Sequence, residues 1–163
     1  MDPITVSTTI ALPREQVFDY LQDISNHPEF SDHYLVDWHL TREDPVGTGA
    51  GARFRVKATL SRFSWADMTI AECDPPYRIV EHGRGGKFNR IRMLGVYTLS
   101  PASAGATKVE YTIETEVKLP SDKLLEAIGR GRAKRQAAKA MRRLRSILEE
   151  NRGRGRKASV AAD

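Results

Sequence analysis

The sequence of 163 residues has a single cysteine and no long apolar run. One thiol, Cys73, allows no disulfide within the chain and no cysteine-based metal site, which fits a reducing compartment. No apolar stretch approaches the roughly 20 residues of a membrane-spanning helix. The first residues follow a strand-like pattern and not the charged-then-apolar pattern of a secretion leader. We therefore expect a soluble, cytoplasmic protein without a membrane span.

The motifs of several common site classes are also missing. No two histidines stand at the short helical spacing of a metal site such as H-x-x-x-H, so the sequence predicts no metal and no cofactor. Glycines at alternate positions in Gly47–Gly51 connect two predicted strands and do not open a helix, which excludes a dinucleotide fingerprint there. No Ser/His/Asp or Cys/His arrangement can be recognised. The four histidines are expected at the surface or at helix ends: His27, His33, His39 and His82.

Positive charge is concentrated near the carboxyl end. The chain has a net charge of +5, and most of the excess Lys and Arg lies between Ser121 and Lys157. Such a surface can attract an acidic protein, a nucleic acid or an anionic lipid, and it equally suits a solvated helix face. No aromatic side chains interleave the basic run to stack bases, which disfavours nucleic acid as a partner. Residues 152–163 are rich in Arg, Gly and Ala and predict a basic disordered tail after one domain of residues 1–151.

One long amphipathic helix is predicted from Ser121 to about Asn151. Pro120 and Ser121 provide a start signal, and the Arg/Gly run beyond Asn151 ends it. Two interior glycines, Gly129 and Gly131, each cost on the order of 1 kcal/mol relative to alanine. Close packing on a strand or room for a ligand would explain them. The apolar positions at a spacing close to three or four are Leu124, Leu125, Ile128, Ala133, Ala137, Ala140, Met141, Leu144, Ile147 and Leu148.

Upstream of that helix the pattern predicts one strand, two short helices and six further strands. Ile4 to Leu12 alternates apolar and polar residues, the period of a half-buried strand. Two short helices follow, one over Arg14 to Leu21 and one that carries Phe30. Short connections between the later strands indicate an antiparallel meander. These strands are expected over Tyr34–Thr41, Ala52–Leu60, Ser64–Cys73, Tyr77–His82, Arg90–Ser100 and Thr107–Val117.

Strand registers are predicted from facing charges and turn lengths. In the last hairpin, a turn over 101–105 places Arg92 opposite Glu114 on the outer face. In the hairpin at Ser61 to Phe63, a three-residue connection keeps Trp65 and Asp67 outside, whereas a two-residue connection turns both inward. We favour the first, because Ala58 and Val56 then share a face with Ala66 and Met68. The second would make Asp67 a buried carboxylate.

The order of these elements and several short motifs resemble the START-like superfamily, also called SRPBCC, and its bacterial polyketide cyclase/dehydrase branch. The resemblance covers roughly residues 4–150 and implies an α+β helix-grip fold. In that fold a seven-stranded antiparallel sheet is wrapped around a long C-terminal helix, with two short helices after strand 1. It also implies an apolar cavity for a lipid, a sterol or a polyketide-like molecule. The residues that carry it are Pro13, Val17, Leu21, Asp23, His27-Pro28-Glu29-Phe30, Asp74-Pro75-Pro76, Tyr97-Thr98-Leu99-Ser100-Pro101, Gly105, Thr107 and Val109.

The leading hypothesis for function is a binding module, a monomer or a homodimer, that takes up a small hydrophobic molecule between sheet and helix. The alternative is a polyketide cyclase/dehydrase-type enzyme that acts in the same cavity, for which two or more ionisable or hydroxyl groups must converge inside. A third is binding of an acidic partner by the basic helix face and tail. The predicted ligand-binding residues are Phe54, Val56, Met68, Met93, Tyr97, Tyr111, Leu125 and Ile128.

Polar groups for the enzyme alternative come from two sets of residues. Asp67, Glu81 and His82 are candidates for acid/base work inside the cavity, although no spacing compels that role. Tyr97, Tyr111 and Ser64 are the inward hydroxyls most similar to the polar groups that family cyclases use to position a ketone chain. The loop Gly83–Asn89 with Phe88 is expected to be either a plain turn or a gate at the mouth of the cavity.

Overall fold

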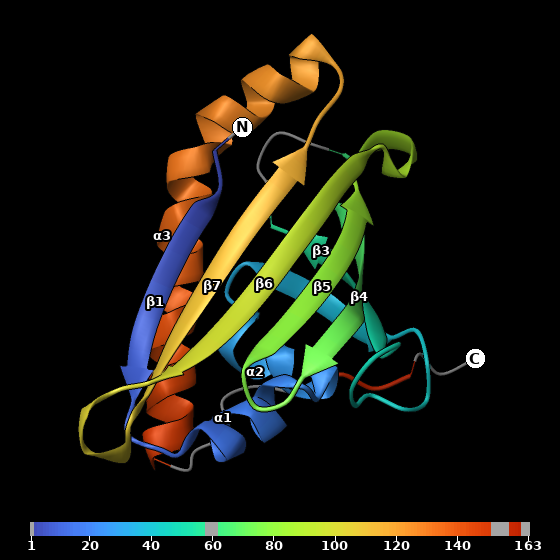
Figure 1. Cartoon of the computed structure of the whole chain (residues 1–163). Coiled ribbons are helices and arrows are strands. Elements are labelled where there is room, and N and C mark those ends of the chain that lie inside the picture. The colour runs from blue at the N-terminus through green and yellow to red at the C-terminus, as the bar shows by residue number, and fades with distance from the viewer. Residues whose placement is uncertain (1, 58–61, 151–156, 161–163) are drawn as a thin grey trace.

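A seven-stranded antiparallel sheet forms the centre of the molecule in the computed structural model, which describes residues 2–57, 62–150 and 157–160 (Figure 1). Its strands lie in the order β1-β7-β6-β5-β4-β3-β2, so the first strand closes onto the last and the rest form a meander. The strands are β1 (Ile4–Ile10), β2 (Leu35–Leu40), β3 (Gly51–Val56), β4 (Trp65–Asp74), β5 (Arg78–Gly85), β6 (Ile91–Pro101) and β7 (Thr107–Glu116).

All three α-helices lie on one side of the curled sheet, which we call its inner face (Figure 1). Two short ones, α1 (Arg14–Leu21) and α2 (His27–Ser31), follow β1, with the 3₁₀ turn η1 (Ile24–Asn26) between them. The long helix α3 (Pro120–Glu150) follows β7. This arrangement confirms the α+β helix-grip fold. In the part of the chain that the structure describes, no helix combines the length and the apolar composition that crossing a membrane requires.

The alternation of side chains across the sheet separates a core face from a solvent face. Register places Ile79, Tyr97 and Tyr111 in one inward row across β5, β6 and β7. Among the intervening positions, Arg78 on β5 and Thr98 on β6 are exposed. Side chains of a strand point alternately to the two faces, so this pattern follows directly from the sequence.

Two predicted registers are wrong, although the predicted faces are right. Arg92 lies opposite Glu116 and not Glu114, and the two side chains form an ion pair of 3.7 Å. In the other hairpin Ala66 pairs with Phe54, because β3 ends at Val56 and the connection is longer than three residues. Residues 58–61, including Ala58, lie outside the described residues. A shift by an even number of residues preserves which face each side chain occupies, so the errors leave the core intact.

The two halves of α3 have different surroundings. Its C-terminal half buries Ala137, Ala140, Met141, Leu144 and Ile147. In the N-terminal half the large apolar side chains face solvent: Leu124, Leu125 and Ile128 are 63%, 51% and 66% exposed.

The prediction that Leu125 and Ile128 lie on the buried face of the helix is therefore wrong. The reason is the five-residue step from Ile128 to Ala133. At about 100° per residue, five residues rotate the apolar stripe by roughly 140° and move it to another side of the helix.

Polar contacts hold the start of α3 to the sheet. The guanidinium of Arg90 donates two hydrogen bonds of 2.7 Å to the carboxylate of Asp122, and Thr115 donates its hydroxyl to Glu126. A Cβ added at Gly129 or Gly131 would meet nothing within 4 Å. The interpretation of these two glycines as sites of close packing on a strand is therefore wrong.

A short piece of the predicted tail contacts the domain. The backbone amide of Ala158 donates to the carbonyl oxygen of Ser25 (2.9 Å), and Val160 forms a parallel bridge with Leu40 at the edge of the sheet. The methyl group of Ala158 is buried. Residues 157–160 thus pack on β2 and η1, where the sequence analysis expects disorder.

Candidate functional site

A small cavity lies between the inner face of the sheet, α2 and the C-terminal half of α3. Its volume is about 30 Å³, which is the share of one water molecule in the liquid. Aromatic rings fill most of the space around it: Tyr97 stacks on Tyr111 with ring centroids 4.2 Å apart, and Trp38 lies 4.5 Å from Phe54. The lining residues are His27, Phe30, Ser31, Tyr34, Leu35, Trp38, Phe54, Met68, Glu81, Tyr97, Tyr111, Ala137, Ala140 and Met141.

The carboxyl group of Glu81 is the most unusual feature of this cavity. Its side chain is buried on the inner face of β5, and Tyr111 donates its hydroxyl to Oε2 at 3.4 Å. The other oxygen, Oε1, lies 3.5 Å from His27 Nδ1 and has no hydrogen-bond partner. Gly95 makes room for this group, since a Cβ there would stand 2.9 Å from Oε2 and 2.8 Å from the Tyr111 hydroxyl.

Local structure around α2 fixes the imidazole of His27 against Glu81. Asp23 caps η1 by accepting hydrogen bonds from the backbone amide and the hydroxyl of Ser25. His27 then begins α2, and its Nε2 lies 2.8 Å from the carbonyl oxygen of Leu21. Because a carbonyl oxygen only accepts, Nε2 carries a proton and Nδ1 is the atom that faces Glu81.

Burial controls the protonation of this cluster. It raises the pKa of Glu81, while nearby His27 and the hydrogen bond from Tyr111 act in the opposite direction. Burial and the proximity of Glu81 also raise the pKa values of Tyr34, Tyr97 and Tyr111. The phenols therefore remain protonated at neutral pH and can donate hydrogen bonds. We call His27, Tyr34, Glu81, Tyr97 and Tyr111 the polar cluster.

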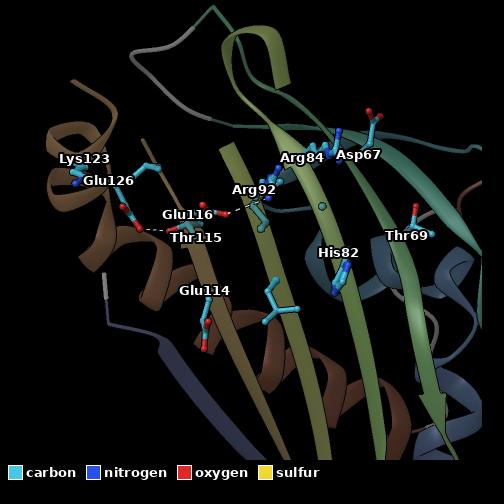
Figure 2. Close-up of a pocket in the computed structure, with 14 residues that line it drawn as sticks. Asp67, Thr69, His82, Arg84, Arg92, Glu114, Thr115, Glu116, Lys123 and Glu126 are labelled. Carbon is cyan, nitrogen blue, oxygen red and sulfur yellow. Dashed lines mark hydrogen bonds and ion pairs between the residues drawn. The ribbon is translucent and has the colours of Figure 1, made fainter. Parts of the chain in front are cut away.

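A larger, open cleft of about 1020 Å³ lies at the end of the sheet where α3 begins (Figure 2). Its lining is strongly charged and comes from β4 to β7, the end of β7 and the first turns of α3. Register places Asp67, Arg84, Arg92 and Glu116 in one row across four strands, on the solvent face of the sheet. The lining residues are Asp67, Thr69, His82, Gly83, Arg84, Arg92, Met93, Leu94, Glu114, Thr115, Glu116, Val117, Lys123 and Glu126.

Two methionines lie side by side with Gly83 on the inner face, one in the lining of each space. Met68 lines the cavity and Met93 lines the cleft, and both flank Gly83 in the inward row of the sheet. The missing Cβ of Gly83 would lie 3.0 Å from the Met68 sulfur and 3.2 Å from the Met93 methyl group. Methionine has three flexible side-chain bonds, so the side chains of Met68 and Met93 can rearrange at low cost.

The structure brings together half of the predicted ligand-binding residues. Phe54, Met68, Tyr97 and Tyr111 line the small cavity, and Met93 lines the cleft. Val56 is half-buried at the end of β3, opposite Leu35, and lines neither space. Leu125 and Ile128 are exposed on α3, away from both.

The candidate acid/base residues lie on different faces of the sheet. Glu81 is in the polar cluster, whereas Asp67 and His82 lie on the solvent face, the face that the favoured hairpin prediction gives for Asp67. His27 is buried and not at the surface as predicted. Glu81 is two residues from Ile79 and from Gly83 on the same strand, so the sequence alone indicates that its side chain points to the inner face. The burial of His27 depends on how α2 packs beneath α3, which no local pattern reveals.

A metal-binding group is not seen among residues 2–57, 62–150 and 157–160, where no three His, Cys, Asp or Glu side chains gather as ligands would. The polar groups that line the small cavity include a buried carboxyl group, an imidazole and three phenols.

Comparison with known families and structures agrees with the geometry. Residues 1–149 match the family model described as polyketide cyclase/dehydrase and lipid transport. A search of curated protein sequences finds no match.

Several solved structures share the fold. The solution structure of KanY aligns with a TM-score of 0.70 at 15% identity, over 91% of this chain and 97% of that one. A Deinococcus radiodurans protein gives 0.63 at 18% identity, over 93% and 100%. DynU16, from the dynemicin biosynthetic locus, gives 0.63 at 17% identity over 98% of this chain, which spans about half (51%) of DynU16. At these identities the likeness concerns the fold alone.

Proposed function

The chain belongs to the polyketide cyclase/dehydrase and lipid transport family, and from that premise we propose that it binds a small hydrophobic molecule on the inner face of the sheet. A lipid, a sterol or a polyketide-like molecule has the required apolar body. Its apolar part would lie against the aromatic and methionine side chains, where burial yields roughly 25 cal/mol per Å². Its polar end would reach the polar cluster, which fixes its orientation.

The observation that carries this proposal is the unsatisfied oxygen of Glu81. A buried polar atom without a hydrogen-bond partner costs about 1–3 kcal/mol. Oε1 lies beside the cavity, which Tyr34, Tyr97 and Tyr111 also line. A ligand hydroxyl or carbonyl group at this point would satisfy the cluster and recover that cost.

The space for the ligand body would come from the inner-face part of the cleft, which Gly83, Met93 and Thr115 line. A cavity of about 30 Å³ takes a water molecule or the polar tip of a ligand, and not the whole molecule. Gly83 and Gly85 present no side chains on the inward path from the cleft to the cavity. Movement of Met68 and Met93 away from Gly83 would join the two spaces.

Native mass spectrometry of the protein purified from its own host tests the proposal. We expect a stoichiometric hydrophobic passenger, which can be released and identified. Met93→Trp should block the path from the cleft and reduce passenger occupancy at least tenfold. Thr98→Trp is the matched control, because it adds the same ring on the exposed face of the same strand. Equal occupancy in both variants, or a protein that never carries a passenger, would contradict binding at this site.

A second candidate function is catalysis of the cyclase/dehydrase type in the same place. The observation that favours it is the convergence of a carboxyl group, an imidazole and phenols around one cavity. Glu81 has a raised pKa and could exchange a proton with a carbon next to a carbonyl group, while Tyr97 or Tyr111 donates to the carbonyl oxygen.

This second function requires turnover of the identified passenger or of its precursor. The catalytic hypothesis predicts that Glu81→Gln abolishes product formation and leaves occupancy near that of the wild type. Tyr97→Phe should reduce the rate less, since Tyr111 keeps its hydroxyl near the same point. Absence of product from the wild-type protein would leave binding as the function.

A further inference from the structure

Exposed apolar side chains concentrate at one end of the molecule. This is the end of the sheet at which α3 begins and at which η2 (Lys87–Asn89) joins β5 to β6 (Figure 1). We call it the open end. Most of the large hydrophobic side chains that the structure leaves exposed lie here, whereas Val46, Tyr77 and Val160 lie elsewhere and Trp65 packs against His39 and Arg53. The apolar rim of the open end consists of Phe63, Phe88, Leu119, Leu124, Leu125 and Ile128.

The backbone conformation of Phe88 holds its side chain in solvent. Its ring is 86% exposed, and its φ of 59° places a bulky residue in the left-handed region. That conformation is rare for a large side chain and costs of order 1 kcal/mol or more. The turn therefore holds an aromatic ring in solvent at an energetic cost, in place of a glycine or asparagine that would fit without strain.

Basic side chains accompany the apolar rim. Lys87 lies over the rings of Phe63 and Phe88, at 5.7 and 5.1 Å from their centroids. Lys118 and Lys123 are exposed on either side of Leu119, at the start of α3.

Several acidic side chains of this end are paired. Asp122 is buried against Arg90 and Glu126 accepts from Thr115, while the exposed Glu116 is matched by Arg92. The acidic side chains Asp67 and Glu114 line the cleft on the solvent face of the sheet, so the rim itself is apolar and accompanied by lysines.

We propose that the open end docks on a lipid bilayer with anionic headgroups. Leucine, isoleucine and phenylalanine side chains would enter the interface between headgroups and acyl chains, and lysines would lie against the phosphates. The solvent face of α3 continues this surface, because Leu124 and Ile128 share it with Arg135, Lys139 and Arg142 at 3.6 residues per turn.

The shape of the rim favours a bilayer over a second protein. Its side chains protrude from three separate segments: the residues just before β4, the β5–β6 connection, and the beginning of α3 with the residue before it. Lysine, which is interleaved with them, is depleted at the cores of protein interfaces. A bilayer interface accepts separate apolar side chains flanked by lysines without matching their shape.

Flotation with phosphatidylcholine vesicles, with and without phosphatidylglycerol, tests the proposal on the full chain and needs no ligand. We expect binding only to vesicles that contain phosphatidylglycerol, with affinity that falls as salt rises. The variant Leu124→Ser, Leu125→Ser, Ile128→Ser should lose at least about tenfold in affinity, since one fully buried leucine is worth about that much. Lys118→Gln with Lys123→Gln should lose roughly fivefold per lysine.

A matched control replaces apolar side chains that are exposed outside the open end. Val46→Ser with Tyr77→Ser should bind as the wild type does. Circular dichroism establishes that each variant is folded. The proposal is overturned if the wild type ignores anionic vesicles or if the triple serine variant binds them equally well. It is also overturned if that variant instead abolishes a concentration-dependent dimer, which would make the rim a contact between two copies. Ligand occupancy is measured in a separate experiment. None of these vesicle-binding results therefore decides whether the protein carries a hydrophobic molecule on its inner face.

Discussion

The two halves of α3 show how one helix serves two purposes. The C-terminal half packs Ala137, Ala140 and Met141 over the small cavity and closes it, while Leu144 and Ile147 extend the core. The N-terminal half buries only Asp122 and is tied to the sheet through polar contacts. The same residue types, at similar spacing, thus fix the fold in one half and stand in solvent in the other. Apolar spacing alone does not distinguish the two.

The largest effect is expected from truncating a buried leucine in the C-terminal half. Leu144 is fully buried, so Leu144→Ala should reduce the free energy of unfolding by about 2–5 kcal/mol. Leu125→Ala, the matched change in the N-terminal half, should alter it by less than about 0.5 kcal/mol. Urea denaturation measures both. Similar losses for the two variants would show that the N-terminal half is packed after all.

Glycine replacement sharpens the same comparison in the opposite direction. Gly129→Ala and Gly131→Ala should each raise the free energy of unfolding by roughly 0.5–1 kcal/mol, because alanine favours helix and the added methyl groups meet no atoms. Thermal and urea unfolding would detect this. A loss of stability in either variant would mean that a neighbour lies closer to the helix than the structure indicates.

The polar cluster beneath the C-terminal half predicts a specific pH dependence. Burial raises the pKa of Glu81 above its unfolded value of about 4.3, so the folded state is favoured while the carboxyl group is protonated. As pH rises past about 4.3, the unfolded chain ionises first and wild-type stability falls until the folded pKa is passed.

Glu81→Gln should remove this fall. Its stability relative to the wild type should therefore increase with pH over that window. Urea denaturation at a series of pH values gives the curve, with the exposed Glu72→Gln as control. A difference between Glu81→Gln and the wild type that does not change with pH would contradict a raised pKa of Glu81.

The smallest effect is expected at His33, which joins α2 to the C-terminal half. Arg143 lies 2.9 Å from its Nδ1, and its Nε2 donates to the carbonyl oxygen of Gln136. Burial lowers the pKa of His33 below its unfolded value of about 6.5, so the neutral form stabilises the fold above that pH. Stability should fall as pH drops below about 6.5, and His33→Gln should flatten this slope. His39→Gln, at a half-buried site of β2, should leave it unchanged.

The sequence predicts some features of the structure better than others. It predicts which face of the sheet a residue occupies, but not which residues pair across strands or which side of α3 is buried. Alternation places Phe54, Met68, Tyr97 and Tyr111 correctly, because a period of two decides which face a strand residue occupies. It does not fix which residues pair, because pairing depends on turn geometry. Arg92 lies opposite Glu116, and not opposite Glu114 as the sequence predicts.

Errors in α3 and in the site have other causes. The five-residue step between Ile128 and Ala133 marks where the apolar stripe changes side, and a strict count of helical angle would have found it. Glu81 was recognisable as inward by parity with Ile79. The burial of His27 against Glu81 arises from packing between segments far apart in the chain, which no local pattern contains.

Hydrogen exchange along α3, followed by mass spectrometry, tests the contrast between its halves most directly. Local opening is cheap where few apolar contacts are broken. We therefore predict that amides of residues 124–135 exchange at least tenfold faster than amides of residues 137–148. Equal protection along the whole helix would contradict the account, because it would require the N-terminal half to be held as firmly as the half that closes the cavity.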